Sequence, residues 1–159
     1  EKGIDIIPVC GVAGPGDRWQ FVPDIQAAVE TLPSDPARIF LAIGKQHLAP
    51  FAARAQHHYL LRLVDPPEGS LPLPDAQAII ARGPFAEADD LALLQDLRIT
   101  HIIAKNAGGM GAEAKLKAAR TLGIPVILVD RPSLPERQTF ATVDAVLCWI
   151  DPHSARRGL

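Results

Sequence analysis

Cysteine, aromatic residues and net charge are all scarce in this chain of 159 residues. Its two cysteines, Cys10 and Cys148, show no metal-binding spacing, so we expect free thiols in a reducing compartment. The aromatic share of 5% favours helices packed on a sheet over an all-β sandwich. The net charge of −2 lacks the basic surplus that nucleic-acid binding needs, so nucleic acid is not an expected partner and any anion site must be built locally.

Long apolar runs are missing as well. No stretch approaches the ~20 residues needed to cross a bilayer, and no signal peptide is visible, so we expect a cytoplasmic protein that does not bind membranes. The five histidines lack the spacing of metal ligands. His57 and His58, for example, are adjacent in an extended segment, where neighbouring side chains leave opposite faces. No metal site is therefore expected.

Short apolar runs alternate with amphipathic segments along the chain. The runs predict strands at 4–9, 39–43, 58–64, 78–81, 99–104 and 124–129, and the segments predict helices at 23–32, 47–55, 87–97, 112–122 and 142–150. Continuously apolar strands are typical of a parallel sheet that helices cover on both faces. We therefore expect an α/β fold with one doubly wound, mostly parallel sheet, either Rossmann-like or flavodoxin-like. Residues 1–19 are expected to form an atypical N-terminal segment and linker, and residues 20–159 a single domain of this class.

The most informative stretch runs from Ile99 to Gly111, where an apolar strand stops at a lysine and a glycine-rich turn before a helix begins. In α/β proteins this order exposes backbone N–H groups and the positive end of a helix dipole to an anionic ligand. The turn residues are Lys105, Asn106, Ala107, Gly108 and Gly109. Their spacing matches neither the P-loop nor the dinucleotide fingerprint, so it indicates an anion without naming it. An ordinary connection that binds nothing is the alternative.

Other cations and glycines follow the ends of further predicted strands. Ligands of open parallel sheets bind beyond the carboxyl ends of the strands, so these segments should meet at one edge of the sheet. The candidate binding residues outside the turn are Gly44, Lys45, Arg62, Arg82, Gly83, Pro84, Lys115 and Arg131.

Several candidates have competing structural roles. Asn106 could cap the turn, and Arg62 could form an ion pair against one face of the sheet. Arg131 could pair with a nearby acid on the surface, and Lys115 could be a solvated helical lysine. The acids within Glu87–Asp90 open a helix, which suits the helix dipole without a catalytic role. No residue stands out as a catalytic acid, base or nucleophile.

Motifs spread over most of the chain carry a family resemblance. They are G-D-R-W at 16–19, F-L-A-I-G-K-Q at 40–46, R-L-V-D-P-P at 62–67, A-R-G-P-F at 81–85, K-N-A-G-G at 105–109, A-K-L-K-A-A-R-T-L-G-I-P-V at 114–126, R-P at 131–132 and C-W-I-D-P-H-S-A-R-R-G at 148–158. Together they resemble the C-terminal half of the precorrin-6A reductases, cobalt-precorrin-6A reductases included, from about Gly14 onward. Two features depart from the family pattern: Ala107 stands where members usually carry serine, and the family's N-terminal half, with its own nucleotide loop, is missing from this sequence.

The resemblance implies a reductase that uses NADPH as its cofactor. Its substrate would be a carboxylate-rich tetrapyrrole, precorrin-6A or cobalt-precorrin-6A, which gains a hydride at one double bond to give precorrin-6B in cobalamin biosynthesis. This chain would supply the C-terminal half of the enzyme, with the missing N-terminal half as its partner. Two other classes stay open: a non-catalytic module that binds a nucleotide or a tetrapyrrole, and a flavodoxin-like domain that binds a phosphate at the Lys105 turn.

Overall fold

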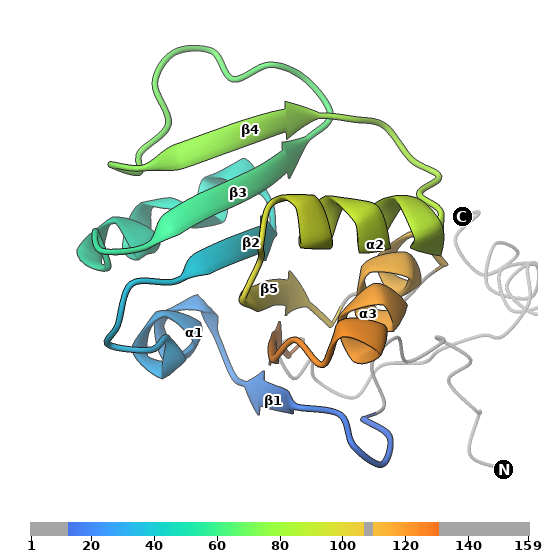
Figure 1. Cartoon of the computed structure of the whole chain (residues 1–159). Helices are drawn as coiled ribbons and strands as arrows, with labels where there is room; N and C mark the ends of the chain where they lie inside the picture. Colours follow the sequence, from blue (N-terminus) through green and yellow to red (C-terminus); the bar gives the residue numbers. More distant parts are fainter. Residues whose placement is uncertain (1–12, 107–109, 131–159) are drawn as a thin grey trace, which may run out of the picture. The chain divides into compact units, whose positions relative to one another are not determined.

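Six parallel strands form one sheet in the described part of the chain (Figure 1). The computed structural model describes residues 13–106 and 110–130, which all belong to one compact unit, Val9–Pro132. The order across the sheet is β1-β6-β5-β2-β3-β4, and all neighbouring strands are parallel. The strands are β1 (Trp19–Val22), β2 (Arg38–Ala42), β3 (His58–Leu63), β4 (Ala76–Ile80), β5 (His101–Lys105) and β6 (Val126–Val129).

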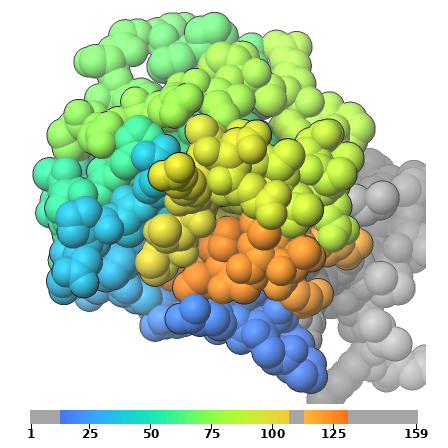
Figure 2. All heavy atoms as spheres, in the orientation of Figure 1, coloured from blue at the N-terminus to red at the C-terminus, as the bar shows by residue number. Residues whose placement is uncertain are grey.

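Helices cover both faces of this sheet. α2 (Glu87–Asp96) and α3 (Met110–Leu122) lie side by side in front of the sheet in Figure 1, and their atoms form adjoining bands in Figure 2. The opposite face carries α1 (Ile25–Thr31) and two 3-10 turns, η1 (Lys45–His47) and η2 (Ala49–Ala53). The two groups of helices contact separate sets of core residues. The expected doubly wound α/β fold is therefore confirmed.

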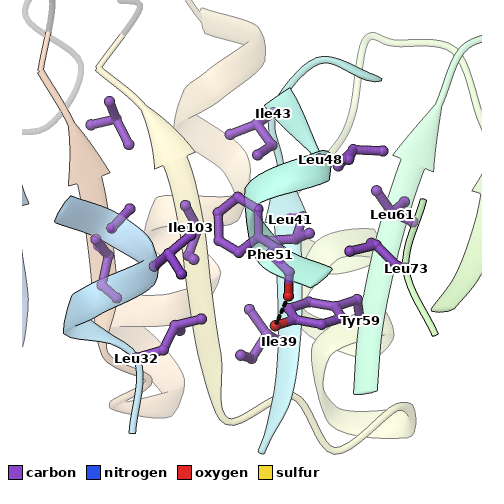
Figure 3. Close-up of a cluster of buried hydrophobic side chains, with 14 of the residues drawn as sticks. Leu32, Ile39, Leu41, Ile43, Leu48, Phe51, Tyr59, Leu61, Leu73 and Ile103 are labelled. Atoms are coloured by element: carbon purple, nitrogen blue, oxygen red, sulfur yellow. Dashed lines mark hydrogen bonds between the residues drawn. The ribbon is translucent and has the colours of Figure 1, made fainter. Parts of the chain in front are cut away.

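The core on the α1 face is built from alternate side chains of the strands and from the 3-10 turns (Figure 3). Phe51 of η2 is fully buried between strand residues that include Leu41 and Ile103. The Tyr59 hydroxyl donates hydrogen bonds to the carbonyl oxygens of Phe51 and Arg54, at 3.1 and 3.0 Å. Burial raises the pKa of Tyr59 to about 12. These contacts attach the 3-10 turns to β3 and so hold the segment that follows β2 against the sheet.

The direction of winding reverses between the two central strands, β2 and β5. From β2 the chain continues outward to β3 and β4, whereas from β5 it continues the other way to β6. Because crossovers between parallel strands are right-handed, connections that run in opposite directions along the sheet place their helices on opposite faces. The structure shows this arrangement, with α1 and the 3-10 turns on one face and α2 and α3 on the other. In doubly wound sheets the carboxyl ends of the strands at such a reversal are the usual ligand position.

Some predicted elements differ from those in the structure. The helix expected at 47–55 is replaced by η1 and η2, in which backbone N–H groups bond three residues back, as from Phe51 to Leu48. Pro50 explains the change, because it lacks the N–H that an α-helix interior would use. The strand expected at 78–81 lies at Ala76–Ile80. The predicted strand at 4–9 and helix at 142–150 lie outside the described residues.

β1 was not predicted, and it extends the ordered sheet into the segment expected as a linker. Its Trp19 pairs in register with Val126 of β6. Just before it, the Asp17 carboxylate accepts two hydrogen bonds from the Arg120 guanidinium of α3, at 2.8 and 2.7 Å. The Arg120 hydrogen bonds hold the pKa of Asp17 below its usual value. The G-D-R-W motif thus joins the start of β1 to α3.

Candidate functional site

Lys105 is the last residue of β5 and stands at the reversal point of the sheet. Ile103 faces the α1 side of the sheet, so the alternation of strand residues puts Lys105 on that side as well. There its Nζ lies 2.5 Å from Nε2 of His47, which belongs to η1. The end of β5 therefore meets the segment that follows β2, although the two side chains are 58 residues apart in sequence.

Gly44 and Lys45 lie in the same segment, immediately after β2. Lys45 opens η1 and is exposed. A side chain at Gly44 would meet the amide group of Gln46, whose Oε1 lies 2.5 Å from the ideal Cβ position. The parallel sheet thus brings Lys45, His47 and Lys105 to the carboxyl ends of its two central strands.

Asn106 connects the ends of β5 and β6. Its backbone N–H donates to the Val129 carbonyl at 2.8 Å, and its side-chain amide donates to the Asp130 carboxylate at 3.2 Å. The edge therefore carries cations beyond β2 and β5 and an acid beyond β6. Lys115 follows on α3 as a half-buried residue. Helix α3 begins at Met110, two residues before the predicted start, so the strand and the helix on either side of residues 107–109 are both confirmed.

Arg62 is the penultimate residue of β3 and lies on the α2 face of the sheet, opposite to the face that carries Lys105. Its guanidinium pairs with the Asp90 carboxylate of α2, and these side chains are 13% and 2% exposed. The Arg62 guanidinium also contacts two aromatic rings, with its Cζ 5.3 Å from the Phe40 centroid and 4.1 Å from the Phe85 centroid. The ion pair that the sequence left open as an alternative is thus present, and Arg62 joins β3, α2 and the segment after β4.

Arg82, Gly83 and Pro84 follow β4, the outermost strand on one side of the sheet. Three strand spacings, ~14 Å in all, separate β4 from β5, so these residues share the edge with Lys105 without being close to it. Arg82 is exposed and pairs with the Asp65 carboxylate at 2.7 Å.

Four predicted site residues lie outside the described residues: Ala107, Gly108, Gly109 and Arg131. Conversely, His47, Asp90 and Asp130 belong to the contacts above although the sequence did not single them out for these roles. For His47 and Asp130 a usable signal existed, because each comes a few residues after a predicted strand. No local pattern could reveal that Asp90 would meet Arg62.

A metal site has no support in the described part of the chain, where no three histidine, cysteine, aspartate or glutamate side chains gather in a suitable cluster. His57 is fully buried, and its Nδ1 accepts a hydrogen bond from the Ala37 N–H at 3.1 Å. His58 instead contacts the Asp75 carboxylate at 2.8 Å. Across the same residues, no helix has the length and apolar character needed to span a membrane.

Comparison with known proteins gives consistent matches. A family model described as precorrin-6x reductase CbiJ/CobK matches residues 9–151. A precorrin-6A reductase of Rhodobacter capsulatus is 65% identical over 140 residues, covering 88% of this chain and 56% of the relative. A precorrin-6A reductase of Sinorhizobium is 47% identical over 142 residues, covering 87% of this chain and 54% of the relative. A cobalt-precorrin-6A reductase of Priestia megaterium is 27% identical over 141 residues.

A solved structure described as CobK precorrin-6A reductase matches with a TM-score of 0.84 at 63% identity, covering 91% of this chain and 59% of that chain. The chain thus spans little more than half the length of the relatives that it matches. The family model, however, covers most of the chain itself, including β1 to β6 and the Lys105 edge. The chain belongs to the precorrin-6x reductase family.

Proposed function

We propose that this chain supplies one half of a precorrin-6A reductase. Together with the rest of a family-length protein, it would use NADPH to reduce one double bond of the tetrapyrrole precorrin-6A and release precorrin-6B. The proposal rests on the family match and on one observation, the Lys105 ammonium at the reversal point of the sheet. Because the chain belongs to this reductase family, we do not propose the alternative of a flavodoxin-like domain that binds a phosphate at the Lys105 turn.

The residues at this edge fit a polyanionic ligand. Lys105 contacts an imidazole, and within the described residues no carboxylate forms an ion pair with it. Its charge is therefore available to a phosphate of NADPH or a carboxylate of the macrocycle. Exposed Lys45, which follows β2, adds a second cation at the same edge of the sheet. The Asp130 carboxylate beyond β6 disfavours an anion on its own side, so the favourable side lies over β2 and β5.

NADPH supplies the hydride when it is bound, and the protein's contribution is to bind, orient and exclude water. In this proposal Lys105 and Lys45 hold anionic groups of the ligand, and Asn106 keeps the ends of β5 and β6 together. A fixed ligand position matters because hydride transfer requires the reacting atoms to approach within ~3–3.5 Å.

Titration calorimetry of NADPH and NADP⁺ against the chain and Lys105→Glu tests this assignment. We expect weak binding to the unmodified chain and an affinity lower by ~10-fold or more in the variant, as for loss of a charge-assisted hydrogen bond. Arg18→Glu is the matched control, because it makes the same charge change just before β1, at the opposite edge of the sheet. Equal affinity in Lys105→Glu would remove Lys105 from the site, and equal losses in both variants would indicate a non-specific charge effect.

A binding module without catalysis is the second candidate, because the chain spans little more than half the length of its relatives. To distinguish the half-reductase from the binding module, turnover is measured after the other half of a family-length protein has been added. Ligand binding without any turnover in that mixture would favour the module.

A further inference from the structure

His47 is a residue near Lys105 whose role the proposed function does not explain. Its Nε2 lies 2.5 Å from the Lys105 Nζ, in a partly buried contact. A lysine ammonium can only donate hydrogen bonds, and an imidazole nitrogen accepts one only when it carries no proton. The contact therefore requires a neutral His47 with its proton on Nδ1.

The backbone around His47 is well anchored. Its N–H donates to the Gly44 carbonyl at 3.0 Å, which forms the 3-10 turn. The next residue, Leu48, is 1% exposed and packs in the core beside Ile43, as Figure 3 shows. The imidazole is therefore carried by a segment whose position is set by the sheet and the core.

Lysine, in contrast, has a long side chain with many rotamers, and it loses this freedom only when a partner selects one of them. A carboxylate partner would select a rotamer but would also cancel much of the positive charge. A neutral imidazole selects the rotamer and leaves the charge in place. This difference distinguishes His47–Lys105 from the ion pairs of Arg62, Arg82 and Arg120, in which the cation meets a carboxylate.

We propose that His47 is a positioning residue, which holds the Lys105 ammonium at the carboxyl ends of β2 and β5 so that it meets an anionic oxygen of the ligand. The inference rests on the proposed function, because Lys105 must bind the ligand for its position to matter. The anionic oxygen belongs either to a phosphate of NADPH or to a carboxylate of the tetrapyrrole.

A double-mutant cycle on the 159-residue chain tests the proposal, with NADP⁺ and a carboxylate-rich porphyrin as separate probes. We expect His47→Ala to raise the dissociation constant of one probe by ~3- to 10-fold, the effect of losing one hydrogen bond. In a Lys105→Met background the same change should have no further effect. His47→Gln should restore most of the affinity, because its side-chain oxygen can also accept from lysine. The probe that responds identifies the ligand group.

His101→Ala is the control, since His101 lies at the other end of β5. Nitrogen NMR of the unmodified chain adds a readout that needs no variant: His47 should be the Nδ1–H tautomer, and Lys105→Met should change the tautomer ratio. An Nε2–H tautomer in the unmodified chain, or additive effects of the two substitutions, would overturn the positioning role. Loss of affinity in Lys105→Met but not in His47→Ala would overturn it while leaving the proposed function intact. If neither probe bound to the unmodified chain, the positioning role of His47 and the assignment of Lys105 to the ligand site would both be contradicted.

Discussion

At the scale of single residues, the ion pair of Arg62 and Asp90 joins β3 to α2 on the face of the sheet opposite to Lys105. Both side chains are largely buried, and the guanidinium also lies against two aromatic rings. We expect Asp90→Ala to lower the free energy of unfolding by about 3 kcal/mol, because it leaves a buried guanidinium without its partner. Urea unfolding followed by circular dichroism measures the loss.

The exposed pair of Arg82 and Asp65 is the control for that prediction. Its side chains are 73% and 66% exposed, so Asp65→Ala should cost less than ~1 kcal/mol. Similar small losses in Asp65→Ala and Asp90→Ala would show that the Arg62 contact does not stabilise the fold.

Buried His57 makes stability depend on pH. Burial is the main cause that lowers its pKa below the usual 6.5, with smaller contributions from the charges of Arg54 and His101. The unfolded chain therefore takes up a proton at a higher pH than the folded one. The stabilisation is complete above about pH 6.5 and is lost as the pH falls toward the folded-state pKa.

We expect His57→Asn to flatten the decline of unfolding free energy below pH 6.5, because asparagine does not titrate and its oxygen can still accept from Ala37. Burial lowers the pKa of His101 as well, so the double variant with His101→Asn should be flatter still. Chemical unfolding at several pH values checks both. An unchanged slope in the double variant would contradict the assignment.

At the scale of elements, α1 and α2 differ in the residue that precedes the helix. The Asp24 side chain caps α1 by accepting from the Ala27 N–H at 2.8 Å, whereas Ala86 precedes α2 and offers no side-chain acceptor. We expect Asp24→Ala to cost about 1 kcal/mol and Ala86→Ser to add about 0.5–1 kcal/mol. Thermal and urea unfolding measure both effects.

The two cap substitutions should be additive in one chain, because α1 and α2 lie on opposite faces of the sheet. A destabilising Ala86→Ser would show that the start of α2 does not use a capping side chain in solution.

The sequence pattern predicted the central elements better than the outer ones. β2, β3, β5 and β6 are nearly continuous apolar runs because both of their faces are covered. β1 lies at the edge of the sheet, and its Gln20 and Phe21 are exposed, so no apolar run marks it. Pro50, in contrast, was a visible signal against the helix expected at 47–55, because proline is strongly unfavourable inside an α-helix.

The candidate site was predictable to a similar extent. Parallel strands bring their carboxyl ends to one edge, so the positions of Lys45 and Lys105 at that edge follow from the pattern of strands. The contact partners of the cations, in contrast, do not follow from the pattern of strands. Arg62 meets Asp90 and Lys105 meets His47 through tertiary packing of segments far apart in sequence, which local periodicity cannot report.

At the scale of the whole molecule, we expect this chain alone to catalyse little or no reduction of precorrin-6A by NADPH. Cofactor and substrate of such size usually lie in a pocket between two domains, and we expect the described unit to supply only one wall of such a pocket. Adding the other half of a family-length protein should restore turnover, followed by the absorbance of the macrocycle. Turnover by the chain alone at ~1–10³ s⁻¹ would contradict this expectation.

The pairing of β1 with β6 also has a consequence for synthesis. Trp19 and Val126 are neighbours in the sheet but roughly 100 residues apart in the chain. A ribosome adds ~5–20 residues per second, so β1 waits roughly 5–20 s for its partner to be made. Meanwhile β2, β3 and β4 can pair with their sequence neighbours. The strand that is translated first among the six is therefore the one that enters the sheet last.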